Sequence, residues 1–325
     1  MSKSQQAQTN LLENNARHPQ DVGLLLFDLD DTIVQSGSYV SNRVLKALEQ
    51  AHDDGYALSI ASGRPLCSVN RALLKSGTMD YAVCSNGATV TRLSDSTTVC
   101  HRPLAQEDAL FCYRMLAPYR PAWNAFFDDR ALFEWKGASY MLTGRTGAVA
   151  RASRYSSKGA GTLKRVARLM RRGMRYVWLS LTNKGHTQVR SILPALQRAT
   201  NGVDKIGCTI PNEFECEESF LRLSEDGRFE VVRMGKTELE ITAKGVTKGT
   251  GTRVLMDYLG LTTSELVAFG DGGNDLPLAE VVGRFVAMGN ADDDVKAQAD
   301  DVCPSVADDG VAVWIENNLL KGQKS

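Results

Sequence analysis

Short apolar runs alternate along the chain with stretches in which apolar residues have helical spacing. The first run is LLLF at residues 24–27, and the polarity changes abruptly at Asp28. Four consecutive apolar residues are typical of a strand that is buried on both faces of a parallel sheet. Similar runs predict further strands at residues 57–61, 81–84, 266–269, 284–288 and 301–303.

Helices are predicted between these strands. Ser41 fits an N-cap, and Gly55 fits the end of the helix that Ser41 would begin. A second helix is expected at residues 66–76, and a third opens near Lys248. Strand, helix and strand in this order form right-handed crossovers. The sequence therefore predicts an α/β fold with a doubly wound, mostly parallel, Rossmann-like sheet.

Residues 93–242 show a different pattern, in which short alternating strands are interleaved with amphipathic helices. We expect this segment to be an inserted α+β cap domain. Residues 22–92 and 243–325 would then form the core domain. Residues 1–21 are polar and rich in Gln and Asn, which predicts a flexible tail.

The charge distribution separates the predicted cap further from the rest of the chain. The 38 Lys and Arg residues balance the 38 Asp and Glu residues, yet residues 135–203 contain no acidic residue. Such a basic field attracts anions, either a phosphorylated small molecule or nucleic acid. For most of these basic residues we expect a solvated face that pairs with the acidic segment 213–218 or with acidic loops in the core.

The spacing of cysteines and histidines argues against a structural zinc site. The seven cysteines are scattered without a C-x-x-C pair, and none of the four histidines lies at ligand spacing from another. Scattered cysteines fit a reducing compartment, so we expect a cytoplasmic protein. No apolar run reaches the roughly 18 residues that a membrane-spanning helix needs.

Residues with catalytic or ligand chemistry lie where predicted strands end or a predicted helix begins. Taken alone, two aspartates after a strand could form an ordinary acidic turn. However, the carboxyl ends of parallel strands meet at one edge of a sheet, so we expect these side chains to converge. Oxygen ligands favour Mg²⁺ over zinc. The residues concerned are Asp28, Asp30, Ser62, Lys248, Asp271, Asn274 and Asp275.

These residue types suit metal-assisted phosphoryl transfer. A carboxylate can attack phosphorus once Mg²⁺ has neutralised the phosphate oxygens, which gives an aspartyl-phosphate. A second carboxylate can protonate the leaving oxygen and later take a proton from water. A lysine and a hydroxyl can hold the transferring group.

Several motifs occur in a fixed order: FDLDDT at 27–32, SGR at 62–64, NGA at 86–88, KG at 248–249, and VAFGDGGNDLPL at 267–278, followed by VAMGNA at 286–291. With these motifs the sequence resembles the haloacid dehalogenase superfamily of phosphatases, and within it the Cof-type branch that carries a large α/β cap. The resemblance covers residues 22–92 and about 239–317. In the cap it extends only to the architecture.

The resemblance implies a role for each of these residues. Asp28 would be the nucleophile and Asp30 the general acid and base. Mg²⁺ would be held by Asp28, the main-chain carbonyl of Asp30, and Asp271. Asp275, behind these ligands, would orient Lys248 or a metal-bound water. The residues implied to hold phosphate are Ser62, Gly63, Lys248 and Asn274.

Two features depart from the family pattern. Asp31 replaces the usual glycine of the first motif, and we expect its carboxylate to point away from the site. The basic segment in the cap is longer than the insertion that is usual in the family, so the resemblance does not identify the substrate. Candidate substrate contacts in the cap are Asp128, Asp129, Arg145 and Arg154.

The predicted function is a Mg²⁺-dependent phosphatase, a phosphoric monoester hydrolase, that acts on a small phosphorylated metabolite such as a sugar phosphate or a phosphorylated cofactor. A phosphomutase of the same superfamily is an alternative, because it would use the same nucleophile and acid. A non-catalytic protein that binds nucleic acid or another anion through the cap is a third reading. It is disfavoured, because a binder does not need this set of acidic residues. Neither the oligomeric state nor the substrate follows from the sequence.

Overall fold

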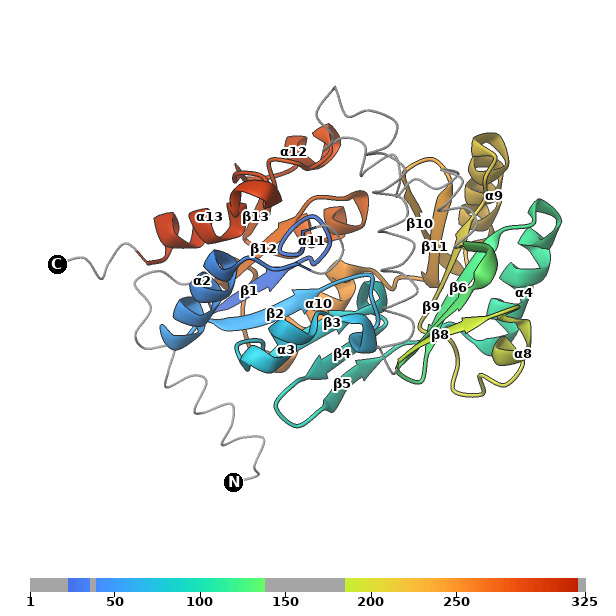
Figure 1. Ribbon diagram of the computed structural model, residues 1–325, viewed down its shortest axis with the longest axis horizontal. Helices are drawn as coiled ribbons and strands as arrows, with labels where there is room; N and C mark the ends of the chain where they lie inside the picture. Colours follow the sequence, from blue (N-terminus) through green and yellow to red (C-terminus); the bar gives the residue numbers. More distant parts are fainter. Residues whose placement is uncertain (1–22, 36–38, 138–184, 321–325) are drawn as a thin grey trace, which may run out of the picture. The chain divides into compact units, whose positions relative to one another are not determined.

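The computed structural model describes residues 23–35, 39–137 and 185–320. The predicted tail at residues 1–21 lies outside this part of the chain. The described chain forms two compact units, each with its own sheet (Figure 1). Of the described residues, those up to Gly63, those from Val69 to His101 and those from Thr247 onward form the core unit. The described residues within Arg64–Ser68 and Arg102–Val246 form the cap unit. The units thus divide after residues 101 and 246, against predicted boundaries after 92 and 242.

The core unit is built on a sheet with the strand order β14-β13-β12-β1-β2-β3-β4-β5. The six strands from β14 to β3 pair in parallel, and β4 and β5 are added by antiparallel pairing. The predicted fold class, a doubly wound and mostly parallel sheet, is confirmed. The strands are β1 (Leu24–Phe27), β2 (Ala57–Ala61), β3 (Tyr81–Cys84), β4 (Thr89–Arg92), β5 (Thr97–His101), β12 (Leu266–Gly270), β13 (Arg284–Ala287) and β14 (Asp301–Val302).

Helices cover both faces of this sheet, as the register shows. Phe27 and Phe269 are paired on β1 and β12 and stack, and Trp314 packs edge-on against Phe269. The opposite face carries Val83, which lies against Gly251. Helices α13 and α10 therefore lie on opposite faces, and burial of each large apolar side chain contributes about 1.5–3 kcal/mol. The core helices are α2 (Asn42–Asp53), α3 (Arg71–Ser76), α10 (Lys248–Leu259), α11 (Leu276–Ala279), α12 (Asp293–Ala297) and α13 (Gly310–Asn318).

Local signals in the sequence explain where these helices begin. Ser41 caps α2 as predicted, because its side chain accepts a hydrogen bond from the Val44 amide at 3.1 Å. The single helix predicted at residues 66–76 is wrong. A 3-10 turn at Leu66–Ser68 is followed by a separate helix, because the Asn70 side chain accepts from the Ala72 amide and caps α3 anew.

The cap unit contains a second, mostly antiparallel sheet with the order β10-β11-β9-β6-β7-β8. Its strands and helices enclose one cluster of buried apolar residues, which includes Trp123, Ile206 and Leu223. None of the helices in the described part of the chain combines the length and the apolarity that crossing a bilayer requires. The cap elements are α4 (Gln106–Leu116), β6 (Ala122–Phe127), β7 (Arg130–Glu134), β8 (His186–Val189), α8 (Leu193–Leu196), β9 (Lys205–Thr209), α9 (Glu213–Asp226), β10 (Phe229–Met234) and β11 (Glu238–Ala243).

Candidate active site

Three neighbouring strands of the core sheet end at the same edge and deliver predicted residues there. Asp28 follows β1, Ser62 follows β2, and Asp271 follows β12. Hydrogen bonds extend the sheet by one residue at two of these ends. The Asp28 amide donates to the Phe269 carbonyl at 3.0 Å, and the Ser62 amide donates to the Val83 carbonyl at 2.8 Å. The backbone of both residues is therefore fixed by the sheet itself.

Lys248 joins two segments that are far apart in the sequence. It occupies the first turn of α10, where Thr247 caps the helix by accepting from the Thr250 amide. The Lys248 Nζ lies 2.6 Å from Asp28 Oδ1 and 2.7 Å from Asp275 Oδ1, and its side chain is fully buried. A buried ammonium group held by two carboxylates has little freedom, so it fixes Asp28 and Asp275 relative to each other.

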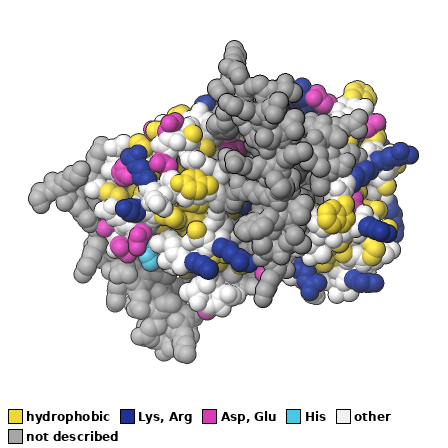
Figure 2. Space-filling model, in the orientation of Figure 1, with side chains coloured by type: hydrophobic (Ala, Val, Ile, Leu, Met, Phe, Trp, Pro, Cys, Tyr) yellow, Lys and Arg dark blue, Asp and Glu magenta, His cyan; other side chains and the backbone are white. Residues whose placement is uncertain are grey.

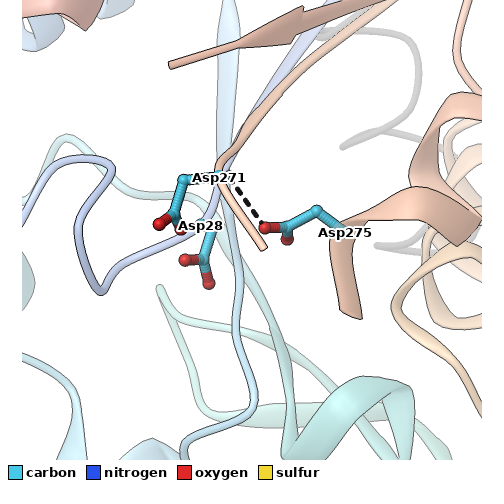
Figure 3. Close-up of side chains that lie close together, drawn as sticks. All are labelled: Asp28, Asp271 and Asp275. Atoms are coloured by element: carbon cyan, nitrogen blue, oxygen red, sulfur yellow. Dashed lines mark hydrogen bonds between the residues drawn. The ribbon is translucent and has the colours of Figure 1, made fainter. Parts of the chain in front are cut away.

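Asp28, Asp271 and Asp275 bring three carboxylates together. Figure 3 shows their side chains gathered at one place, and one oxygen from each lies within 4.8 Å of the others. Three carboxylates against the single charge of Lys248 leave an excess of negative charge. All of these side-chain donors are hard oxygens, so the group fits a cation of the Mg²⁺ type.

The pKa shifts in the site have the same physical origin. Burial raises the pKa of Asp28 to about 7, with the charge of Lys248 opposing this and the charges of Asp275 and Asp30 adding to it. Burial also raises the pKa of Asp271 well above its usual value, and the charges of Asp28 and Asp275 raise it further. Burial alone would lower the pKa of Lys248, but attraction to Asp275 and Asp28 outweighs this and raises it. A divalent cation at the carboxylates would relieve their repulsion.

Asp275 is held in place by hydrogen bonds at both of its oxygens. Its Oδ1 accepts a hydrogen bond from Lys248 Nζ, and its Oδ2 accepts hydrogen bonds from the amides of Asp271 and Gly272, each at 3.0 Å. The dashed line in Figure 3 marks the bond from Asp271. The Asp275 side chain therefore turns back toward the end of β12 and lies against Gly270. A Cβ at Gly270 would lie 2.5 Å from Asp275 Cγ, so only glycine leaves room for this side chain. The glycine before Asp271 is therefore a steric requirement of the site.

The variant Gly270→Ala is expected to displace Asp275 and with it Lys248. A shift of about 1 Å in a catalytic group can lower the rate by about 10²-fold, and we expect a loss of this size in kcat/KM. Steady-state kinetics on an aryl phosphate would measure it. Gly273→Ala is the matched control, because a Cβ at Gly273 meets nothing within 4 Å. Equal activity of both variants would contradict the steric argument.

The turn after β3 also approaches the site closely. Ser85, Asn86 and Gly87 all have positive φ angles. A Cβ at Gly87 would lie 2.1 Å from the Thr247 carbonyl oxygen, so this glycine allows the start of α10 to approach the turn. The Asn86 side chain accepts a long hydrogen bond from Asn274 Nδ2 at 3.5 Å. The NGA motif thus connects the beginning of α10 with the loop that contains Asn274.

Asp30 and Asp31 lie beyond the end of β1, in the loop that leads to α2. Asp30 is exposed, and its charge contributes to the raised pKa of Asp28, so it lies near the buried carboxylate. Asp31 has a φ of 59°, a left-handed conformation that favours glycine and explains the glycine usual at this position. Asp31 is half-buried, and its charge contributes to the raised pKa of Asp271. This carboxylate therefore adds to the negative charge around the site.

The variant Asp31→Gly is expected to raise the free energy of unfolding by about 1 kcal/mol, because glycine adopts the left-handed conformation without steric cost. Urea denaturation of the metal-free protein would measure the change. Asp31→Asn is the control, since it removes the charge but keeps a side chain. If Asp31→Asn were stabilised as much as Asp31→Gly, charge rather than backbone conformation would explain the gain.

The sequence model of a family described as haloacid dehalogenase-like hydrolase matches residues 25–315. The chain belongs to this family. Among curated proteins, a pyridoxal phosphate phosphatase from Escherichia coli is 26% identical over 305 residues, which cover 91% of this chain and 98% of that protein. A 5-amino-6-(5-phospho-D-ribitylamino)uracil phosphatase from Bacillus subtilis is 22% identical and covers 94% of this chain and 98% of its own length. A shorter match, 46% identical over 81 residues, covers 31% of a putative phosphatase from Haemophilus influenzae.

Solved structures share the fold. A haloacid dehalogenase-like hydrolase from B. subtilis superposes with a TM-score of 0.77 at 21% identity and covers 92% of this chain and all of its own. A sugar phosphatase of subclass IIB gives a TM-score of 0.67 at 22% identity, with coverage of 91% and 98%. The family assigned from the motifs and the enzyme class of phosphoric monoester hydrolase are thus confirmed.

The predicted cap contacts of this hydrolase are only partly described. Asp128 and Asp129 form the turn between β6 and β7, and Asp129 Oδ1 accepts from the Cys67 amide at 3.0 Å within the cap unit. Asp128 Oδ1 accepts a long hydrogen bond from Asn201 at 3.4 Å. Arg145 and Arg154 lie outside the described residues. In the described structure both aspartates therefore hydrogen-bond within the cap itself.

Most of the acid-free segment 135–203 also lies outside the described residues. In the described part of the chain, the acidic segment expected to pair with it forms ion pairs with other residues: Glu213 with Lys236, Glu217 with Arg233, and Glu218 with Arg222. These partners belong to α9 and to the β10–β11 hairpin. In Figure 2, described Lys and Arg side chains lie at several separate places on the visible face, among hydrophobic side chains. Among the described residues, the acidic segment therefore pairs with its own neighbours.

Proposed function

We propose that this hydrolase is a Mg²⁺-dependent phosphatase that acts on a small phosphorylated metabolite through an aspartyl-phosphate on Asp28. The observation that carries the proposal is the buried Lys248, hydrogen-bonded to both Asp28 and Asp275, beside the carboxylate of Asp271. Three carboxylates beside one ammonium group leave an excess of negative charge, which is costly to bury without a compensating cation and is typical of functional sites. A phosphate ester together with a divalent cation is the ligand that matches it.

Each residue has a defined task in this proposal. Asp28 is buried but keeps an exposed fraction of 6%. It attacks phosphorus and is oriented by Lys248. Asp30 is exposed beside it, donates a proton to the leaving oxygen, and then takes a proton from the water that opens the acyl phosphate. Asp275 holds Lys248 in place.

Two groups of residues bind the phosphate and the metal. Ser62, Gly63 and Asn274 hold the phosphate oxygens together with Lys248, because Ser62 and Asn274 lie in loops at the same edge of the sheet as Asp28. Mg²⁺, held by Asp28, Asp271 and the main-chain carbonyl of Asp30, would neutralise the phosphate oxygens. Asp28 and Asp271 belong to the group of carboxylates that lie within 4.8 Å of one another, and their hard oxygens fit a cation of this type.

The substrate class rests on the relatives that align over nearly their whole length. Two of them are named as phosphatases of pyridoxal phosphate and of a phosphorylated ribitylaminouracil, which are both small phosphate monoesters. All seven cysteines are free thiols, which supports our placing of the enzyme in a reducing compartment such as the cytoplasm.

A screen of phosphorylated metabolites at fixed Mg²⁺ tests this proposal. Sugar phosphates, pyridoxal phosphate and a phosphorylated ribitylaminouracil would be assayed for released phosphate, with Asp28→Asn as the blank. Hexose phosphates would also be assayed for isomerisation, which would indicate a phosphomutase. Phosphate release from one class, dependent on Asp28, is the expected result. Release no greater than in the blank for every compound would contradict the proposal.

A further inference from the structure

The loop that carries Asp28 and Asp30 is held by hydrogen bonds within its own backbone and by hydrogen bonds to residues outside it. The amides of Ile33 and Val34 both donate to the Leu29 carbonyl, at 3.2 and 2.7 Å. The Asp31 amide donates to the Val34 carbonyl at 3.1 Å. The Asp31 carbonyl receives a hydrogen bond from outside the loop, because Asn290 Nδ2 donates to it at 2.8 Å.

Asn290 lies in the VAMGNA motif after β13. No role has been assigned to this motif in the proposed reaction. Asn290 Oδ1 accepts from the Val306 amide at 2.8 Å, while the Val306 carbonyl accepts from Gln35 Nε2 at 2.5 Å. Asn290 and Val306 thus hold the loop at two points, Asp31 and Gln35. The arrangement needs a side chain that both donates and accepts, as an amide does.

The hydrogen bond from Asn290 acts on a strained residue. Asp31 has a left-handed backbone with a φ of 59°, and such a conformation persists only where the surroundings enforce it. Its amide is held by Val34 and its carbonyl by Asn290, so both sides of the residue are fixed. Asp30 directly precedes it and is exposed. The backbone at Asp31 therefore does much to determine where the Asp30 carboxyl lies.

We propose that Asn290 is a positioning residue that holds the Asp30 carboxyl in place to protonate the leaving oxygen. The inference rests on the proposed role of Asp30 as general acid. A positioning role differs from a purely structural one in how the loss of Asn290 depends on the leaving group, because proton donation matters most for poor leaving groups. An activated phenol leaves without a proton, whereas a basic alcohol or phenol needs one.

The test is the dependence of kcat/KM on the leaving group, measured with a series of substituted aryl phosphates at saturating Mg²⁺. This ratio reports phosphoryl transfer to the enzyme and not the later hydrolysis of the intermediate. In Asn290→Ala we expect a loss of about 10²-fold for the most basic phenols and only a few-fold for 4-nitrophenol. The plot of log kcat/KM against leaving-group pKa should therefore become steeper than in the parent enzyme.

Three further variants make the result decisive. Asp30→Asn should steepen the same plot. Asn318→Ala removes a comparable amide, which donates to the Trp314 carbonyl at 2.8 Å on α13, and should leave the plot unchanged. Gln35→Ala removes the second hold on the loop and should steepen the plot less than Asn290→Ala, which keeps the test available if the latter folds poorly.

The outcomes separate this inference from the proposed function. A steeper plot in both Asp30→Asn and Asn290→Ala supports the positioning role. If the plot is steeper only in Asp30→Asn, and Asn290→Ala lowers kcat/KM equally for all substrates, the positioning role is overturned and the proposed reaction stands. An unchanged plot in Asp30→Asn overturns both the acid role of Asp30 and the inference that depends on it.

Discussion

Replacing Asp28 with Asn is expected to lower kcat by at least ~10³-fold, because an amide cannot attack phosphorus and the variant keeps only the binding contribution of the site. Phosphate release from 4-nitrophenyl phosphate with Mg²⁺ would measure the loss. The fold should survive, because Lys248 retains its hydrogen bond to Asp275 at 2.7 Å. Thermal unfolding of the same preparation would verify this.

A matched substitution separates the nucleophile from general charge effects. Asp31→Asn removes a nearby carboxylate that is not proposed to react, and it should keep most of the activity. If Asp28→Asn retained activity close to that of Asp31→Asn, the assignment of the nucleophile would be wrong.

Replacing Lys248 with Met is expected to have the largest effect on stability. The substitution leaves Asp28 and Asp275 buried without their shared ammonium group, and removal of one partner from a buried ion pair costs about 3–5 kcal/mol. Urea denaturation without metal would measure the change in the free energy of unfolding. Activity should fall as well, because Asp28 loses the group that orients it.

Lys236→Met is the control for this substitution. Lys236 also pairs with a carboxylate, Glu213 at 3.0 Å, but its side chain is 76% exposed. Exposed pairs contribute about 0–1 kcal/mol, so this variant should unfold almost like the parent protein. If the Lys248→Met protein were as stable as the Lys236→Met protein, loss of the buried ion pairs would not cost the expected free energy of unfolding.

The sequence was most informative where local chemistry decides the structure. Apolar runs located the parallel strands of the core, because strands buried on both faces have no polar alternative. The helix that begins near Lys248 was predicted from the apolar residues that it carries, Val254, Leu255, Tyr258 and Leu259. The convergence of Asp28, Ser62 and Asp271 followed from the same topology, since the carboxyl ends of adjacent parallel strands meet at one edge.

Features that depend on tertiary contacts were not visible in the sequence. The fold-back of Asp275 over Gly270 and the approach of Thr247 to Gly87 are steric facts of the folded chain. Strand β5 extends the core sheet past residue 92 because it pairs with β4, and an edge hairpin has a weak periodic signal. Asn290 stood in a recognised motif, but its hydrogen bond to the Asp31 carbonyl needed coordinates. Its role as a positioning residue remains our proposal.

The most direct test of the account is to find where phosphate becomes attached during turnover. The Asp30→Asn variant would be mixed with 4-nitrophenyl phosphate and Mg²⁺ and quenched in acid, since slower hydrolysis should let the intermediate accumulate. Peptide mass spectrometry is predicted to find phosphate on the peptide that carries Asp28, in an amount equal to the first burst of nitrophenol, and none in Asp28→Asn. A burst of nitrophenol without phosphate on that peptide, or phosphate on another residue, would contradict the account.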